Sequence, residues 1–266
     1  MPEGHTIHRL AREHTRLLKG QALAVSSPQG RFEAGAARLS GRVLRRVEPY
    51  GKHLWYHFAG EPDPLHVHLG LYGKFTASPL PPPEPRGALR LRMMSAEVAV
   101  DLRGPTACDL TTPAERLQVL ARLGPDPLAA RPDGTAGWLR VTRSRAPIGV
   151  LLMDQSVLAG VGNVYRAEVL FRQVISPFRP GRELREDEWV ALWDDLVLLM
   201  RAGVRSGRIV TTRPADRARR SGRPTRDDSF YVYRRQGLPC RLCGAEVRTE
   251  EMGGRNLFWC PHDQCR

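Results

Sequence analysis

The spacing of hydrophobic side chains divides the chain into a helical start, a β-rich stretch and a helical second half. Residues 5–19 repeat hydrophobic positions at intervals of three and four, which is typical of an amphipathic helix, and Gly20 follows as its stop. From 21 to about 110 the pattern changes to short alternating runs separated by glycine and proline clusters. The clearest runs are 42–47, 53–58 and 96–102. They predict a mostly antiparallel β domain, a sandwich or a flattened barrel.

Helical periodicity returns after a connecting region. Residues 111–135 contain several prolines and glycines, and we interpret them as the connection. Two helical segments between 148 and 173 flank a glycine-containing turn at 159–163. A longer helix is predicted over about 187–202, where tryptophans and leucines share one face, and Gly203 is expected to end it.

The chain carries a large positive charge. Its 266 residues include 41 Lys plus Arg and 28 Asp plus Glu, a formal net charge of +13. An excess of this size indicates a polyanionic partner, most commonly nucleic acid. A hydrophobic content of 41% excludes a disordered or collagen-like chain. No stretch approaches the roughly 18–20 apolar residues of a membrane span, and residues 1–25 are too polar for a secretory signal. We therefore expect a cytoplasmic, nucleoid-associated protein with no membrane partner.

Arginine replaces lysine almost everywhere in this sequence. The only lysines among the 41 basic residues are Lys19, Lys52 and Lys74. Because a guanidinium stays protonated at any working pH, a lysine retained in this background can mark a position where a compact amine must transfer a proton. Lys52 is the candidate we favour, and chance retention is the alternative.

Four of the five cysteines lie near the end of the chain. Cys240 and Cys243 form a C-x2-C pair, sixteen residues separate them from Cys260, and Cys265 completes a C-x4-C pair. This spacing predicts a hairpin on which four thiolates hold one structural Zn²⁺ ion. The second pair is wider than the usual C-x2-C and includes His262, so a Cys3His site is the alternative.

The segment that precedes these cysteines is strongly basic. Residues 201–241 contain twelve Arg against three Asp, a net charge of +9, with scattered glycines and prolines and little periodicity. We interpret this stretch as a flexible basic segment that is able to fold against phosphate.

The first residues offer a distinctive nucleophile. Pro2 is small enough for the initiator methionine to be removed, which exposes a secondary α-amine. An α-amino group titrates near pH 8, so part of it is unprotonated at neutral pH and attack on a sugar carbon gives an iminium directly. Glu3 beside it is able to move protons. Proline at this position also occurs without any catalytic role.

Four separated motifs together resemble the formamidopyrimidine-DNA glycosylase and endonuclease VIII family over essentially the whole chain. They are MetProGluGly at 1–4, GlyLysHis at 51–53 on a predicted strand, LeuAlaGlyValGlyAsnValTyrArgAlaGlu at 158–168, and GlyGlyArgAsnLeuPheTrpCysPro at 253–261. The resemblance implies an α+β fold: an N-terminal antiparallel β-sandwich with an N-terminal helix, a helical helix-two-turn-helix domain and a C-terminal zinc-binding β-hairpin. We expect domain spans of 1–118, 119–233 and 234–266.

The resemblance also implies a bifunctional DNA glycosylase and AP lyase of base excision repair. Mature Pro2 would attack C1′ of a damaged nucleoside, expel the base and leave a covalent iminium that eliminates the 3′ and then the 5′ phosphate. Glu3 would act as general acid and base. Lys52 would donate protons near the sugar and its phosphate. The partner would be double-stranded DNA with damaged bases or abasic sites, and we expect a monomer.

Further residues are implied to bind DNA. Asn163 and Arg255 would clamp a phosphate, with the zinc orienting Arg255 and taking no part in bond breaking. Asn163 can also cap a helix that starts at Val164. Because the target nucleotide must be everted, Leu71 and Tyr72 are candidates for the wedge that fills the gap. The alternative for Leu71 and Tyr72 is an ordinary place in the β core.

Departures from the family pattern concern the subtype. Only about a dozen residues separate 223–227 from Cys240, which favours the endonuclease VIII branch and oxidised pyrimidines over a purine-directed enzyme with a long lesion-capping loop. His5 and Thr6 replace the Pro and Glu often found there, and Gly70 replaces a polar wedge residue. The missing carboxylate at Thr6 fits a good lyase with a weaker glycosylase.

Three other functions compete with this one. An 8-oxopurine-directed glycosylase of the same family is one. A zinc-dependent damaged-DNA-binding protein with little or no glycosylase activity is another, but Pro2, Glu3 and Lys52 argue against it. An RNA-binding or ribosome-associated basic protein would explain the charge and the zinc, but not the N-terminal motif.

Overall fold

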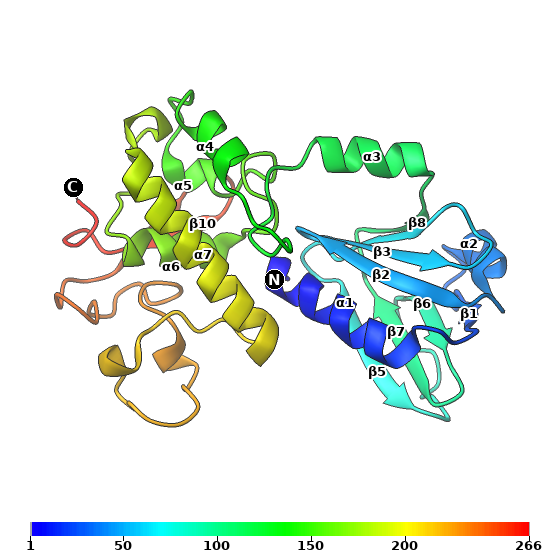
Figure 1. Ribbon diagram of the computed structural model, residues 1–266. Coiled ribbons are helices and arrows are strands. Elements are labelled where there is room, and N and C mark those ends of the chain that lie inside the picture. Colours follow the sequence, from blue (N-terminus) through cyan, green and yellow to red (C-terminus); the bar gives the residue numbers. More distant parts are fainter. Residues whose placement is uncertain (1, 266) are drawn as a thin grey trace. The chain divides into compact units, whose positions relative to one another are not determined.

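The computed structural model describes residues 2–265, and the chain divides into two compact units that span 1–122 and 123–266. Helices and strands of each unit are labelled in Figure 1. Among the described residues, no helix is both long enough and apolar enough to cross a membrane.

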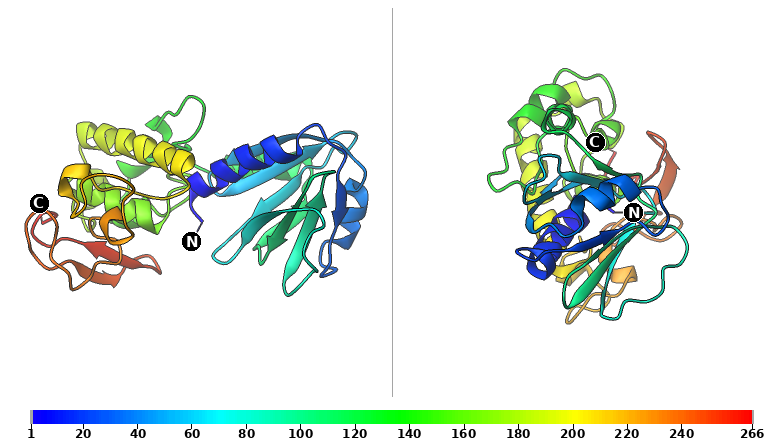
Figure 2. Two further views of the ribbon diagram at one scale, coloured as in Figure 1. Left: turned by 90° about the horizontal axis from the view of Figure 1, so that it is seen from below. Right: turned by 90° about the vertical axis from the view of Figure 1, so that its right-hand side faces the viewer.

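The N-terminal unit consists of one long helix and two antiparallel sheets. Helix α1 (Gly4–Leu18) packs against the first sheet, as Figure 2 also shows. That sheet has the order β2 (Leu44–Tyr50), β3 (His53–Phe58), β4 (Leu65–His68) and β8 (Ala107–Leu110). The second sheet has the order β1 (Ala24–Ser26), β6 (Leu89–Met94), β7 (Val98–Arg103) and β5 (Lys74–Pro79). Two shorter helices complete the unit, α2 (Glu33–Leu39) and α3 (Pro113–Ala121).

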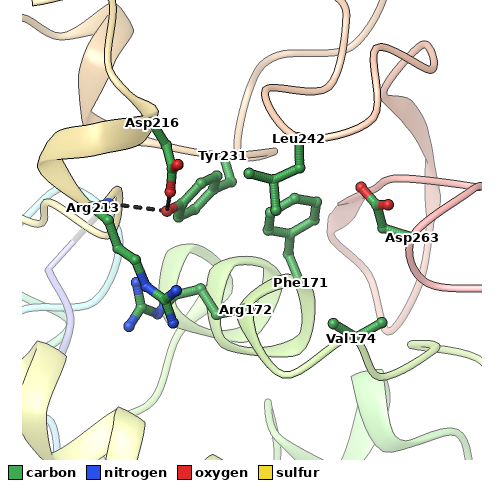
Figure 3. Close-up of a pocket in the computed structure, with 8 residues that line it drawn as sticks. All are labelled: Phe171, Arg172, Val174, Arg213, Asp216, Tyr231, Leu242 and Asp263. Atoms are coloured by element: carbon green, nitrogen blue, oxygen red, sulfur yellow. Dashed lines mark hydrogen bonds between the residues drawn. The ribbon is translucent and has the colours of Figure 1, made fainter.

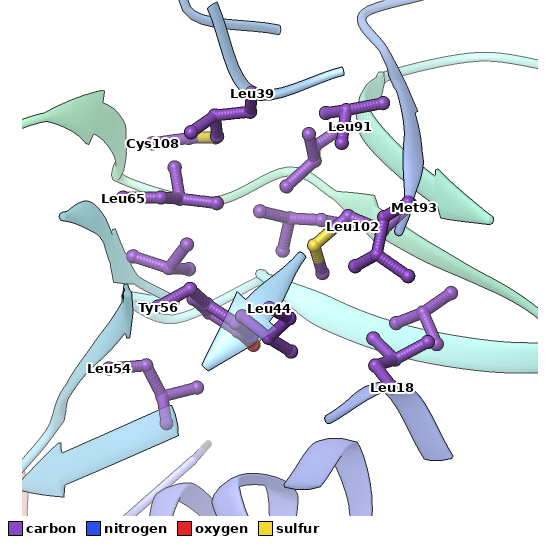
Figure 4. Close-up of a cluster of buried hydrophobic side chains, with 14 of the residues drawn as sticks. Leu18, Leu39, Leu44, Leu54, Tyr56, Leu65, Leu91, Met93, Leu102 and Cys108 are labelled. Atoms are coloured by element: carbon purple, nitrogen blue, oxygen red, sulfur yellow. The ribbon is translucent and has the colours of Figure 1, made fainter. Parts of the chain in front are cut away.

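One hydrophobic core joins the two sheets and α1, which confirms the predicted sandwich. Leu44, Leu54 and Leu65 come from the first sheet, and Leu91 and Leu102 come from the second, all essentially without exposure (Figure 4). Burying each such side chain stabilises the fold by about 1.5–3 kcal/mol. The alternating pattern could be read correctly because each strand turns one face inward.

Helix α3 lies inside the stretch that the sequence pattern predicted as a plain connection. Thr112 accepts a hydrogen bond from the Glu115 amide at 3.2 Å, and the Glu115 carboxylate accepts one from the Thr112 amide at 2.8 Å. This is a capping box, and Pro113 occupies the first turn. No side chain of α3 is buried, so hydrophobic periodicity could not indicate the helix.

The second unit is mainly helical and ends in a β-hairpin. Its helices are α4 (Thr135–Val141), α5 (Ile148–Leu151), α6 (Asn163–Arg172) and α7 (Glu186–Ser206), with 3-10 turns η1 (Gly181–Glu183), η2 (Pro214–Asp216) and η3 (Asp227–Ser229). The hairpin pairs β9 (Arg248–Glu251) with β10 (Asn256–Trp259). Strand β10 packs beside α6, as seen in Figure 2.

Helix α7 buries the face that the sequence predicts, but it runs further than expected. Trp189, Leu192 and Leu196 are all buried on one side. The prediction that Gly203 ends the helix was wrong, because Gly203 is buried within α7 and the helix continues to Ser206. Gly207, with φ of 71°, is the residue that adopts the left-handed conformation and donates its amide to the Gly203 carbonyl at 2.8 Å.

The basic segment after α7 is held by a buried carboxylate. Glu168 on α6 has no exposure, and its oxygens accept the amides of Tyr231, Val232 and Tyr233 at 2.8–2.9 Å. The Thr211 hydroxyl donates to the same carboxylate. Few backbone amides of this segment belong to helix or strand, so side-chain acceptors such as Glu168 satisfy them instead.

Candidate functional site

Helix α1 and strand β2 bring the chain's start and Lys52 to the same end of the N-terminal unit. The Gly20 amide, just after α1, donates to the Leu44 carbonyl at the start of β2, at 2.8 Å. From that junction, the 15 residues of α1 lead back toward the N-terminus and the 7 residues of β2 lead toward Tyr50. Both lengths are about 22–23 Å. Because α1 packs along β2, residues 2–4 lie at the level of the turn after Tyr50.

The turn that follows β4 lies at this end as well. His53 at the start of β3 pairs with His68 at the end of β4. Residues 69–73, which contain Leu71 and Tyr72, therefore leave the sheet beside the turn that contains Lys52. Five of the predicted site residues, from three separate stretches of sequence, thus share one end of the unit. They are Pro2, Glu3, Lys52, Leu71 and Tyr72.

The first residues precede α1 in an extended conformation. Pro2 is partly exposed, whereas Glu3 is completely buried at the N-cap position, and its carbonyl accepts the Thr6 amide at 2.9 Å. The Glu3 side chain makes no capping hydrogen bond to the helix. A buried carboxylate next to the partly exposed Pro2 is suited to proton transfer at that position. His5 is buried too, and burial lowers its pKa to about 4, so it is neutral at pH 7.

Lys52 lies in a tight turn and not on a strand. Tyr50 and His53 are paired across β2 and β3, which leaves Gly51 and Lys52 as a two-residue hairpin turn, with φ of 54° at Gly51. The prediction of a strand for these two residues was wrong because the alternating pattern does not mark where one strand stops and the next begins. The turn places a partly exposed lysine at the edge of the sheet.

Neutral histidines lie near Lys52. The His53 Nδ1 lies 2.9 Å from the Nε2 of His66. The His53 ring is stacked on Trp55 and His66 at 5.5 and 5.1 Å, and it is tilted against His68 at 4.8 Å. Burial first, then the charges of neighbours that include Lys52, lowers the pKa of His53 to about 3. The same causes lower the pKa of His68. These rings remain uncharged at neutral pH, so they add no positive charge beside Lys52.

The turn that carries Leu71 and Tyr72 requires glycine on both sides and exposes both side chains. Gly70 has φ of 66°, and a Cβ there would lie 1.9 Å from the Thr106 hydroxyl. A Cβ on Gly73 would lie 2.3 Å from the Leu69 carbonyl oxygen. Leu71 is 43% exposed and Tyr72 is 86% exposed. The alternative that these are ordinary core residues is therefore wrong.

In the second unit, Asn163 connects α6 to the hairpin. Its Nδ2 donates to the Asn256 carbonyl at 2.9 Å, and its Oδ1 accepts from Arg166. The expectation that Asn163 caps a helix beginning at Val164 was wrong: α6 begins at Asn163, and Gly162 is the N-cap residue. Because the Asn163 side chain is hydrogen-bonded to the hairpin, Gly162 occupies the N-cap position of α6.

Arg255 lies at the tip of that hairpin. Gly253 and Gly254 form the turn with φ of 62° and 68°, values that favour glycine. Arg255 is partly exposed and donates to the Gly254 carbonyl at 2.8 Å. Beneath the tip, the fully buried Arg166 donates to the Met252 carbonyl at 3.0 Å. Asn163 and Arg255 are thus brought together in one unit by contacts across the hairpin.

The chain's end contains a cluster suited to a metal ion. One ligand atom from each of Cys240, Cys243, Cys260 and Asp263 lies within 4.8 Å of the other three. Three of the four predicted cysteines are therefore brought together. Cys265 is not in this cluster: it is exposed, and its thiol donates to the Pro261 carbonyl. His262 is also exposed and lies 3.4 Å from an Asp263 oxygen. Three thiolates and a carboxylate fit a tetrahedral structural zinc ion.

A cavity of about 200 Å³ lies between this cluster and α6 (Figure 3). Phe171, Val174 and Leu242 give it an apolar wall, and Tyr231 donates its hydroxyl to Asp216 at 2.5 Å on one side. Asp263 lies on the opposite side. None of the predicted catalytic residues lines this cavity.

Sequence reasoning missed the buried polar residues that support the site. Arg166 and Glu168 lie within a motif that was recognised, but their positions on α6 look like an ordinary polar helix face. Asp263 could have been found from its spacing, since it stands three residues after Cys260, as Cys243 stands three after Cys240. The histidines at 53, 66 and 68 carry no spacing signal, because strand pairing brings them together.

Three family descriptions match successive parts of the chain. Residues 1–108 match the formamidopyrimidine-DNA glycosylase N-terminal domain, and residues 123–214 match the H2TH domain of the same enzyme. Residues 237–264 match the zinc finger found in FPG and IleRS. These matches cover most of the chain and include every predicted site residue except Cys265.

Relatives and solved structures agree with this assignment. Endonuclease 8 1 of Mycobacterium tuberculosis is 54% identical over 266 residues, 98% of both chains. The formamidopyrimidine-DNA glycosylase of Thermus thermophilus is 32% identical, covering 98% of this chain and 97% of the relative. A complex between the Lactococcus lactis Fpg and abasic-site DNA has a TM-score of 0.82 at 22% identity, covering 99% and 100%, which shows the fold. The chain therefore belongs to the formamidopyrimidine-DNA glycosylase and endonuclease VIII family of DNA-repair enzymes, on its endonuclease VIII-like branch.

Proposed function

We propose that this enzyme excises oxidised pyrimidines from double-stranded DNA and cleaves the resulting abasic site through a Schiff base on Pro2. The observation that carries the proposal is the shared location of Pro2, the buried Glu3 and Lys52 at one end of the N-terminal unit. The greater identity to Endonuclease 8 1, 54% against 32% for a formamidopyrimidine-DNA glycosylase, supports the pyrimidine-directed branch.

The proposed reaction begins with the free imino group of mature Pro2. Its lone pair bonds to C1′ while the bond between C1′ and the base breaks, and the base departs with a proton. Loss of the proton on nitrogen and opening of the sugar ring give an iminium. Removal of a C2′ proton expels the 3′ phosphate, a second elimination expels the 5′ phosphate, and water releases the sugar fragment from Pro2.

Two side chains would move the protons of this sequence. Glu3 would give a proton to the ring oxygen or the departing base and take protons back from carbon, a task that its buried place beside Pro2 favours. Lys52 would donate to a departing phosphate oxygen, because an ammonium is able to release a proton that a guanidinium holds. The zinc would keep the hairpin folded and take no part in these steps.

DNA would be held by both units. Asn163 and Arg255 would grip a phosphate. Asn163 would use the second hydrogen of the amide that already binds Asn256, and Arg255 would use the two parallel donors of its guanidinium. Leu71 and Tyr72 would occupy the space left by the everted nucleotide, since their turn exposes an aliphatic and an aromatic side chain side by side.

Borohydride trapping on abasic-site DNA tests the nucleophile. Wild-type protein is expected to give a covalent complex. One extra residue ahead of Pro2 converts its amine into an amide without a reactive lone pair, and we expect this variant to give none. A matched control carries the same residue added after Arg266. A trapped complex from the N-terminally extended protein would remove Pro2 from the mechanism.

A panel of duplexes with single defined lesions tests the substrate class. Base release and strand nicking are scored separately, so that a good lyase is not mistaken for a good glycosylase. Oxidised pyrimidines are expected to be released faster than 8-oxoguanine. The opposite order would assign the enzyme to purine lesions, and nicking of abasic sites without release of any base would leave only the lyase.

A further inference from the structure

The two halves of the metal cluster have the same local construction. In the first, the Leu242 amide donates to the Cys240 sulfur at 3.4 Å. In the second, the Asp263 amide donates to the Cys260 sulfur at 3.4 Å. The amides two and three residues on, Leu242 and Cys243 in the first half and His262 and Asp263 in the second, donate to the leading sulfur in both. Each half is a short turn that starts at a cysteine and directs backbone amides at its sulfur. Asp263 stands in the second turn where Cys243 stands in the first, three residues after the leading cysteine.

The distances also place Asp263 among the ligands. Its Oδ2 lies 3.1 Å from the Cys240 sulfur, and the sulfurs of Cys243 and Cys260 are 3.4 Å apart. Separations of 3–4 Å are those of neighbouring ligands around a tetrahedral Zn²⁺, whose bonds are about 2.3 Å to sulfur and 2.0–2.2 Å to a carboxylate oxygen.

The backbone after Asp263 turns away from the cluster. Gln264 is buried, where its Oε1 accepts the Cys260 amide at 2.9 Å and its Nε2 donates to the Ile175 carbonyl at 3.0 Å. These two bonds fix the turn from 260 to 264 against the helical part of the unit. Cys265 follows on the exposed side of this anchor, with its thiol directed to the Pro261 carbonyl.

We propose that the structural zinc ion is held by Cys240, Cys243, Cys260 and the carboxylate of Asp263, and that Cys265 is a free surface thiol. The equal spacing of the two turns and the Gln264 anchor carry this assignment. It replaces the four-cysteine set that sequence spacing predicts, and it is independent of the reaction proposed for Pro2.

X-ray absorption of the zinc-loaded full-length protein tests the ligand set directly. The expected first shell contains three sulfurs and one lighter atom. A shell of four sulfurs would overturn the proposal. Because the measurement uses the wild-type protein, it does not depend on whether any variant folds.

Thiol alkylation of the same sample identifies the free cysteine. With zinc bound, we expect peptide mass spectrometry to find Cys265 labelled, and Cys240, Cys243 and Cys260 protected until a chelator is added. Protection of Cys265 that is lost together with that of the other three would contradict the assignment.

Three variants test whether the oxygen ligand of the zinc is the Asp263 carboxylate or a bound water. Asp263→Ala is expected to lower zinc affinity, measured by chelator competition, by at least roughly 10-fold. Asp263→Cys should restore binding with a four-sulfur shell. The matched control Cys265→Ser should retain wild-type affinity and an unchanged shell. If Asp263→Ala keeps wild-type affinity, the oxygen ligand is a water and the proposal fails.

Discussion

At the residue scale, the features that matter most in this protein are polar side chains that are buried. Glu3, Arg166 and Glu168 have no exposure at all. A buried charge is tolerated only where hydrogen bonds or ion pairs compensate its lost hydration. Hydrophobic periodicity treats such residues as surface positions, so the sequence could suggest Glu3 only through the motif at the chain's start, and it gave no sign of the support that Arg166 and Glu168 provide.

Lys52→Arg separates charge from proton transfer at the proposed site. Binding to abasic-site DNA is expected to change by no more than about 3-fold, because the positive charge remains. Strand cleavage is expected to fall by roughly 100-fold or more, the range of a lost general acid. Single-turnover nicking and filter binding measure the two effects. Lys74→Arg, at an exposed position on β5, is the matched control and should cleave normally. Normal cleavage by Lys52→Arg would exclude Lys52 as the proton donor.

Buried neutral histidines should make the fold sensitive to acid. His14 is buried beside the Tyr56 hydroxyl at 2.7 Å, and burial lowers its pKa to about 3. Because the unfolded chain binds a proton near pH 6.5 and the folded chain does not, stability falls as the pH drops from about 6.5 toward 3. His14 contributes a slope of about 1.4 kcal/mol per pH unit.

His14→Gln isolates that contribution. The variant is expected to be less stable than wild type at pH 7, yet its free energy of unfolding should fall less steeply between pH 6 and pH 4, by about one proton. Denaturant unfolding at several pH values measures the slope. His262→Gln, at an exposed position, serves as control. Identical slopes for His14→Gln and wild type would mean that His14 is protonated in the fold.

At the element scale, the turn after β4 presents the proposed wedge. Tyr72→Ala should slow base release from duplex DNA by about 10–100-fold, because one stacked ring is worth roughly 1–3 kcal/mol. Release from single-stranded DNA, which needs no eversion, should change little. Single-turnover excision on both substrates measures the difference. Leu238→Ala, another exposed hydrophobic residue, is the control. Equal losses on both substrates would show that Tyr72 acts on the lesion and not on the gap.

The segment before the zinc hairpin depends on α6. Glu168→Gln keeps the shape of the side chain but removes the charge that accepts three consecutive amides. We expect a loss of about 2–3 kcal/mol in the stability of the second unit, with faster amide exchange at 231–233. Glu183→Gln, half exposed on η1, should change stability by less than about 0.5 kcal/mol. Unchanged exchange at 231–233 would contradict the anchoring role.

The hydrophobic pattern predicted where helices and strands lie, but it did not predict where they begin and end. The helix at the start, the strands and the buried face of α7 followed from periodicity, because each buries one face. The turn at Lys52, the capped helix α3 and the end of α7 did not, since these depend on backbone hydrogen bonds. Asp263, which we propose as the fourth zinc ligand, was not predicted because the spacing was interpreted only in terms of cysteine and histidine ligands.

At the scale of the whole molecule, the site residues come from distant parts of the sequence. Four motifs predicted Pro2, Lys52 and Arg255 as site residues. The pairing of His53 with His68, which places the proposed wedge turn beside Lys52, comes from the sheet register. Within the second unit, the contact of Asn163 with Asn256 joins residues 93 positions apart. The fold, and not the spacing of these residues in the sequence, brings them into contact.

Removal of the metal should affect the two units differently. Chelation is expected to unfold the hairpin and weaken DNA binding, because Arg255 is held by β9 and β10. Hydrogen exchange should rise across 240–265 and at Asn163, whose side chain contacts β10. Exchange in β2, β3 and β4 should stay unchanged, and zinc addition should reverse the effect. Full DNA affinity in the zinc-free protein would show that the hairpin does not hold the phosphate.

The two glycines that enclose Leu71 and Tyr72 have a consequence for how this enzyme can be altered. Neither glycine accepts a methyl group without a clash, whereas the two exposed residues between them have room for other side chains. If Leu71 and Tyr72 fill the gap in the DNA as proposed, a library limited to these two codons would vary the wedge and leave both glycines in place. On that proposal, exchanging one dipeptide would change how the enzyme fills the gap while the turn that presents it keeps its glycines.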